Sequence, residues 1–447
     1  MSTTTSLTPS VAENKQNFDI EQPRTDEKQH ETPHAEAAPQ IISPMHPSQF
    51  PEGGKDAWLC LAGAFCCLFC SFGWLNCVGV FQSYYQLNQL HNHSPSAISW
   101  ISSIQIFVMF FPGPIVGWVC DNHGPKYLLY FGTFFHVLGL MMTSLCTKYW
   151  HFILAQAICS PLGLNCIFNA ATSTVPTWFL KNRGAAYGIM AAGSGLGGVI
   201  LPIMTSHLIP QIGFAWTIRT LAFMILGLML LAMITVKSRL PPTPRKLTVR
   251  MFIEPFKDIK FVMLTLGAFL FFLGVFIPIN YIQVSAIAHG MSLNMSAYLL
   301  PILNSASIFG RIIPGALADK GGKYNMQVLW CTLAGVITLA FIPASSNATF
   351  VVFAVLYGFT SGAYVSLLPA QIAQISRVDQ IGFRVGLLFS CISFAGLIGN
   401  PIGGAIVGND GKFWGLYTFA GVMMLSGSFV FTIARFYVAE WKLFVKI

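Results

Sequence analysis

One arginine lies deep inside an apolar stretch and is the first residue whose type suggests specific chemistry. Arg311 stands about two helical turns before the nearest acidic residue, Asp319, which follows the same stretch. Its planar guanidinium group can hold a carboxylate through two parallel hydrogen bonds. The alternative is a structural arginine that extends to the polar edge of the stretch or binds helix carbonyls.

Two acidic residues, one of which is Asp319, occupy matching positions in the two halves of the chain. Asp121 lies between Gly117 and Lys126, and Asp319 lies between Gly315 and Lys323, with the two glycines 198 residues apart. A carboxylate at a helix end can cap the N–H groups of a neighbouring helix or pair with a basic residue. We therefore expect Asp121, Lys126, Asp319 and Lys323 to form a conformational latch in each half; the alternative is solubilising loop charge.

Apolar stretches of about 20 residues, the length that crosses roughly 30 Å of hydrocarbon as a helix, follow one another from residue 57 onward. They predict an all-α membrane protein with 12 transmembrane helices in two pseudo-symmetric six-helix bundles (57–236 and 261–436), joined by a basic linker (237–260). Residues 1–56, poor in large apolar side chains, are predicted to be a disordered cytoplasmic tail, and residues 437–447 a second tail. The predicted spans are 57–85, 97–119, 127–147, 150–176, 185–209, 214–236, 261–285, 296–318, 327–343, 349–374, 385–407 and 413–436.

The charge content argues against most soluble classes of protein. Only 9% of the 447 residues are Asp, Glu, Lys or Arg, while 54% are hydrophobic, against roughly 25% charged residues in an average soluble domain. The net charge of +9 comes from short loops and not from one continuous face, so nucleic acid is not an expected partner. The 11 cysteines lie within or beside apolar stretches, and no catalytic, metal-binding or cofactor-binding constellation is found. The chain is not expected to be an enzyme.

The distribution of Lys and Arg predicts how the chain crosses the membrane. Basic residues gather in alternate loops and in the C-terminal tail, and the other loops hold only Lys148, Arg219 and Lys412. By the positive-inside rule, both termini are cytoplasmic. Three Asn-X-Ser/Thr tripeptides, which are candidate glycosylation sites at Asn92, Asn294 and Asn347, fall in the loops that this count places outside.

The repeated Asp-containing loop and the twelve stretches resemble the major facilitator superfamily. Two shorter segments resemble signatures of the monocarboxylate porter family: Glu52-Gly53-Gly54 before the first span, and the run that starts at Trp178 before the fifth. The resemblance implies a substrate carboxylate at Arg311 and a cavity lined by the first, fourth, seventh and tenth spans. Polar residues of those spans are then further substrate-binding candidates: Asn76, Asn165, Asn169, Asn280, Tyr281, Tyr357 and Tyr364.

Departures from the porter pattern bear on proton coupling. The chain has Ser307 where such porters usually carry an Asp, and the first span has no Lys. All seven acidic residues after residue 56 lie in loops or the tail, so no carboxylate can carry a proton in mid-membrane. Coupling would need His136 or the substrate's own acid group, and a lone histidine in a helix bundle is more often structural.

We therefore predict a secondary transporter that moves an organic acid or a lipophilic, secondary metabolite by alternating access. The alternatives are an exporter of a bulky neutral metabolite and a non-transporting membrane sensor. The expected partners are a small-molecule substrate and the lipid bilayer, and the expected state is a monomer. We expect the plasma membrane as its location, with the vacuolar or another internal membrane as the alternative.

Overall fold

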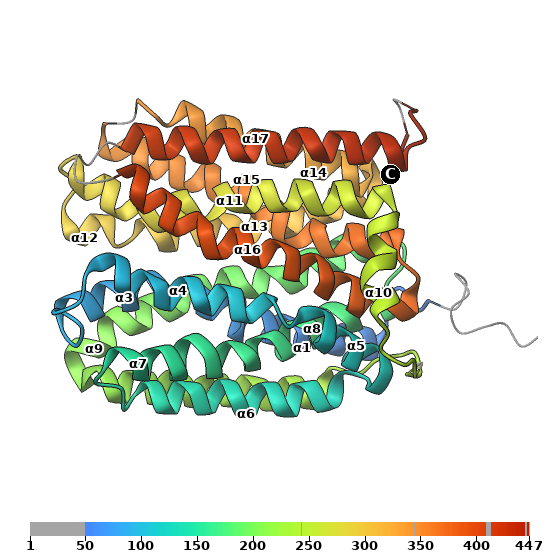
Figure 1. Ribbon diagram of the computed structural model, residues 1–447, viewed down its shortest axis with the longest axis horizontal. Coiled ribbons are helices and arrows are strands. Elements are labelled where there is room, and N and C mark those ends of the chain that lie inside the picture. The colour runs from blue at the N-terminus through green and yellow to red at the C-terminus, as the bar shows by residue number, and fades with distance from the viewer. Residues whose placement is uncertain (1–49, 243, 344, 408–412, 443–444, 447) are drawn as a thin grey trace, which may run out of the picture. The chain divides into compact units, whose positions relative to one another are not determined.

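The described part of the chain is helical throughout its regular structure, as the apolar stretches predict. The computed structural model describes residues 50–242, 244–343, 345–407, 413–442 and 445–446, all in one unit that runs from Ser43 to Ile447. Most of the predicted disordered tail lies outside the described residues, and so does Lys412. Figure 1 shows the long helices running side by side.

The first half consists of five long helical passages, the last of which is a double one. Its elements are α1 (Lys55–Cys70), α2 (Phe72–Leu75), α3 (Val78–Leu87), α4 (Pro95–Phe110), α5 (Gly113–His123), α6 (Pro125–Thr143), α7 (Tyr149–Phe152), the π-helical segment η2 (Ile153–Cys159), α8 (Ser160–Thr174), η3 (Val175–Thr177) and α9 (Arg183–Thr235).

The second half begins after a linker that holds α10 (Val249–Ile253) and η4 (Glu254–Lys257). Its elements are α11 (Ile259–Ala288), α12 (Leu293–Ser296), α13 (Leu299–Gly321), α14 (Lys323–Ala340), α15 (Asn347–Ile375), η5 (Val378–Gln380), α16 (Ile381–Val407) and α17 (Phe413–Val438).

Fewer segments qualify as membrane spans than the 12 predicted. Nine segments of the described residues are long and apolar enough to cross a membrane. One of them, α9, has 53 residues and corresponds to two predicted spans. Its helix is interrupted between them at Gly213, whose φ of 77° is not helical. Helices α6 and α14 cover most of the predicted spans 127–147 and 327–343, but they are less apolar than the nine and are not among them.

A glycine with positive φ ends the corresponding helix in each half. Gly124 (φ 79°) separates α5 from α6, and Gly322 (φ 96°) separates α13 from α14. A left-handed backbone favours glycine, because a Cβ atom would clash with the neighbouring carbonyl. These two positions lie 198 residues apart, so the repeat seen in the sequence is also a repeat of backbone conformation.

The two halves meet mainly along α9 of the first half and α16 of the second. Helix α9 packs against α13, and α16 packs against α4 and α5. The loops rich in Lys and Arg gather at one end of the helices, which we call the basic end. There Asn122 and Asp379 both contact Arg245 of the linker, and Asn325 donates to the carbonyl of Val445 in the C-terminal tail. Figure 1 shows α10 at this end and α3 and α12 at the other.

Candidate functional site

A cavity lies between the two halves, with one side from α2 and the opposite side from α11, α13, α15 and α16. Its free volume is about 40 Å³, which holds a few water molecules but not a metabolite. Most of its wall is apolar and aromatic, including Phe72, Phe272, Phe276, Leu368 and Phe389. The polar lining consists of Asn76, Asn304, Ser307, Arg311, Ser361 and Tyr364.

Arg311 joins the cavity wall to the other half of the molecule. It comes from α13, and its Nη1 donates to the carbonyl of Ala191 (2.9 Å) and to Oγ of Ser194 (2.6 Å) on α9. The side chain is buried, and its Nε has no hydrogen-bond partner among the described residues. No described carboxylate forms an ion pair with it. A buried cation of this kind, at the edge of an apolar cavity, favours an anionic group in the cavity.

The predicted substrate residues divide into two groups in this structure. Asn76, Arg311 and Tyr364 line the cavity, although Asn76 also donates to Ser194 O and Tyr364 to Ala268 O. The others lie outside its lining and serve as ties between or along helices: Asn165 to Met109, Asn169 to Asn165, Asn280 and Tyr281 to Asn400, and Tyr357 to Val275. Their role toward substrate stays a prediction.

The two repeated carboxylates cap helices of the opposite half. Asp121, at the end of α5, accepts the N–H groups of Gly382 (3.1 Å) and Phe383 (2.9 Å) at the start of α16. Asp319, at the end of α13, accepts those of Gly184 (2.8 Å) and Ala185 (2.7 Å) at the start of α9. Each carboxylate meets the positive end of a helix dipole. Of the two arrangements that the sequence left open, the structure has the helix cap.

Small residues let these helices approach closely enough for the caps to form. A Cβ atom on Gly117 would lie 2.1 Å from the carbonyl oxygen of Gly382, and one on Gly184 would lie 2.5 Å from that of Gly315. Such distances are far inside van der Waals contact, so a side chain at either position would separate the two halves. The basic end is therefore closed in this structure.

The predicted basic partners of the latches do not form ion pairs with the two carboxylates. Lys126 lies over the ring of Tyr130, with Nζ 5.9 Å from the ring centre. Lys323 is half-buried at the start of α14; burial lowers the pKa of its ammonium group, and the nearby charge of Asp319 opposes that effect. In this structure, backbone N–H groups, and not the two lysines, donate the hydrogen bonds to Asp121 and Asp319.

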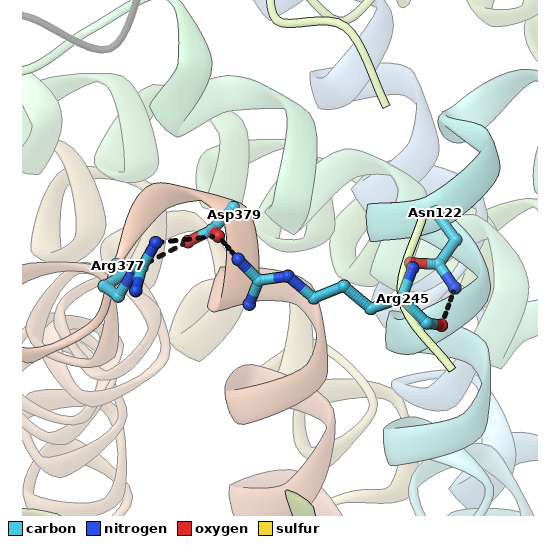
Figure 2. A network of polar contacts seen from close by, with 4 residues as sticks. All are labelled: Asn122, Arg245, Arg377 and Asp379. Atoms are coloured by element: carbon cyan, nitrogen blue, oxygen red, sulfur yellow. Dashed lines mark hydrogen bonds and ion pairs between the residues drawn. The ribbon is translucent and has the colours of Figure 1, made fainter. Parts of the chain in front are cut away.

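A third connection between the halves runs through the linker, and sequence reasoning missed it. The backbone of Arg245 exchanges hydrogen bonds with the Asn122 side chain at the end of α5, at 2.8 and 3.0 Å. Its guanidinium forms an ion pair with Asp379 of η5, which Arg377 also contacts at 3.3 Å (Figure 2). The Asp379 side chain is only 3% exposed. We call Asn122, Arg245 and Asp379 the linker clamp.

Glu52 forms a fourth structured contact at the basic end. Its carboxylate accepts the N–H groups of Leu180 (2.8 Å), Lys181 (2.7 Å) and Asn182 (3.1 Å), just before α9. The two segments that resemble porter signatures therefore touch each other. The sequence predicts a disordered tail that ends at residue 56. In the structure, Glu52 is already held by these three hydrogen bonds, and α1 begins at Lys55.

Replacing Glu52 with glutamine is expected to weaken the start of α9. The amide keeps the shape of the side chain but loses the charge and one acceptor oxygen, and lost helix caps cost about 0.5–2 kcal/mol. The apparent melting temperature of the purified protein in detergent should fall by a few degrees. Lys181→Ala is the matched control, because it removes an exposed side chain and leaves the backbone donor. An equal loss in both variants would contradict the capping role.

The structure also shows the surroundings of His136, of two glycines on α9 and of Asn304. His136 is fully buried in the first half, with Nδ1 2.9 Å from Oγ of Ser160, and it does not line the cavity. On one face of α9, Gly193 and Gly197 lie directly against the backbone of Phe65 and Gly73. Asn304, which the sequence reasoning did not single out, lines the cavity and donates to Gly198 O.

Comparison with known families agrees with this architecture. The model of the Major Facilitator Superfamily matches residues 64–347, and the chain belongs to that superfamily. Its fold is that of the human organic anion transporter MFSD10, whose crystal structure superimposes with a TM-score of 0.68 at 13% identity over 84% of this chain and 98% of that one. Members of this superfamily carry small molecules across membranes.

The curated relatives are fungal transporters of similar length. The chain is 50% identical to "MFS-type transporter 1" of an Ophiocordyceps species over 396 residues, 88% of each chain. It is 45% identical to the "Fujikurins efflux protein" of Gibberella fujikuroi over 397 residues, 88% of this chain and 85% of that one. The chain is therefore a membrane transporter with efflux proteins among its relatives.

Proposed function

We propose that this transporter exports a secondary metabolite that carries an acidic group on an apolar body. The observation that carries the proposal is Arg311, a buried guanidinium at the wall of an aromatic cavity, with a free Nε and no carboxylate partner among the described residues. An anionic headgroup would supply the missing counter-charge, and the phenylalanines would contact the rest of the molecule.

The direction of transport is taken from the relatives. The 45% identical relative is named an efflux protein for fujikurins. From the narrower resemblance to monocarboxylate porters we keep only the acidic group of the substrate. A small monocarboxylate is not proposed, because Ser307 replaces a usual carboxylate and the cavity wall is largely apolar. A bulky neutral metabolite is the alternative substrate.

Alternating access provides the mechanism. With the basic end closed, the cavity is too small for a metabolite, so loading requires the two helix caps and the linker clamp to open. We place the basic end in the cytoplasm, from the distribution of Lys and Arg. Substrate would then enter from the cytoplasm in the opposite state, in which the basic end is open. The plasma membrane, a monomer, and modification of the exposed Asn92, Asn294 and Asn347 are parts of the same proposal.

Comparative metabolite profiling tests this function. Cells with and without the protein are compared for small molecules in the medium and in cell extracts, and vesicle transport is then measured for the identified acid and its methyl ester. We expect an acidic metabolite to move from the medium into the extract when the protein is absent, and the acid to be transported faster than the ester. Retention of a neutral compound would favour the alternative substrate. An unchanged profile would favour the sensor.

A further inference from the structure

The second part of the linker lies across the ends of the membrane helices. After Arg245, residues 246–260, which we call the linker surface segment, form α10 and η4 and lead into α11 at Ile259. Figure 1 shows α10 running across the direction of the long helices and beside their ends. If the long helices cross a bilayer, such a segment lies along the membrane surface.

One side of the linker surface segment packs on the protein, and the other side is apolar and uncovered. The ring of Phe252 lies edge-on to that of Phe383 at 5.2 Å, and Pro255 is buried. In contrast, Val249 is 75% exposed, Ile253 54% and Phe256 43%. Leu247 and Ile259 are exposed as well. An apolar side of this kind, at the end of a transmembrane bundle, fits the boundary between headgroups and acyl chains.

Basic side chains alternate with these apolar ones. Lys246, Arg250 and Lys257 are exposed in the linker surface segment. Of its two acidic residues, Glu254 lies 4.0 Å from Arg250, and Asp258 uses its carboxylate to cap α11 through the N–H of Lys260. Beyond Glu254, two arginines of the second half, Arg377 and Arg384, line the adjoining depression. The surface therefore has an excess of positive charge beside its exposed apolar residues.

We propose that the linker surface segment binds anionic phospholipid headgroups of the cytoplasmic leaflet. A phospholipid places a negative headgroup directly above acyl chains, which matches basic residues placed beside exposed apolar ones. A soluble acidic protein would match the charges but leave the apolar side chains in water. The segment is also joined to long apolar helices on both sides, since α9 ends at Thr235 and α11 begins at Ile259, so both of its ends are held near the membrane. The proposal does not depend on which metabolite is carried.

Lipid retention tests the charge requirement. The full chain is reconstituted in nanodiscs of phosphatidylcholine and phosphatidylserine, and the lipids that remain bound after release are counted by native mass spectrometry. We expect the wild type to retain phosphatidylserine preferentially and Arg250→Gln/Lys257→Gln to lose that preference several-fold. Lys320→Gln/Lys442→Gln is the matched control, because it removes two exposed charges outside the segment. Equal losses in the two double variants, or none in either, would overturn the proposal.

A second measurement locates the segment without relying on lipid counting. All 11 native cysteines are buried or half-buried, so a fluorophore can be attached selectively to Val249→Cys. Brominated acyl chains should quench its emission, more strongly in discs that contain phosphatidylserine and less strongly when Arg250→Gln/Lys257→Gln is added. Emission that brominated lipid does not change would overturn the proposal and would favour a soluble acidic partner.

Discussion

Arg311→Gln is expected to lower transport of the acidic metabolite about 10- to 100-fold and to leave its methyl ester nearly unaffected. A hydrogen bond to a charged group contributes about 1.5–3 kcal/mol, which corresponds to that range in affinity. The affected quantity should be the KM for the acid, because the guanidinium binds the carboxylate in the ground state. Arg311→Lys should recover only part of the loss, since an ammonium group cannot donate two parallel hydrogen bonds.

A purely structural role for Arg311 makes a different prediction, because its Nη1 also ties α13 to α9 through Ser194. Ser194→Ala removes the side-chain acceptor of this tie and keeps the charge. If Arg311 only holds the helices together, both variants should reduce transport of acid and ester alike. The ratio of acid to ester transport, measured in vesicles with equal amounts of folded protein, therefore separates binding of the substrate from packing.

Arg245→Gln is expected to raise the ratio of molecules open at the basic end to molecules closed there by about 5- to 150-fold. Asp379 is almost fully buried, and loss of its cross-half partner should change the balance of states by about 1–3 kcal/mol. Cys120 is a native reporter of this change. It is 5% exposed in the closed state and lines the small cavity that also contains Asp121 and Asp379. Its labelling by a maleimide reagent, located by peptide mass spectrometry, should become faster.

The matched control for the linker clamp is Arg377→Gln. This variant removes the other cation that contacts Asp379, but Arg377 belongs to the same half, so the labelling of Cys120 should stay slow. Cys331, fully buried within the second half, serves as an internal reference. Equal acceleration by both variants would mean that the charge balance at Asp379 matters and the connection between halves does not.

The helical architecture could be predicted from the sequence because lipid imposes a simple pattern, about 20 apolar residues per span with basic residues at one side. The repeat was equally visible, since Gly117 and Asp121 recur 198 residues later. Spacing alone could not decide whether Asp121 pairs with Lys126 or caps another helix. That choice depends on how closely α5 and α16 approach, and this distance is set by glycines far apart in the chain.

The cavity was harder to predict than the fold. Asn76 and Tyr364 line it, whereas Asn165 and Tyr357 lie on the expected helices but bond to neighbouring backbone. A polar residue in a membrane helix meets either a cavity or another helix, and its position along the helix does not distinguish the two. Arg245 and Asp379 were missed for a related reason. Both resemble ordinary loop charges, and only the path of the linker brings them together.

The backbone of Arg245 stays fixed to the end of α5 by Asn122 and by the Nε1–H of Trp118, which donates to its carbonyl at 2.9 Å. When the halves separate, the guanidinium therefore travels with the first half while Asp379 travels with the second. Re-forming the ion pair is an intramolecular event with an effective concentration in about the millimolar range or above, as for partners joined by a short tether. Free guanidinium compounds would compete with it only at comparable concentrations, so the tether favours the Arg245 guanidinium over dilute competitors when the basic end closes again.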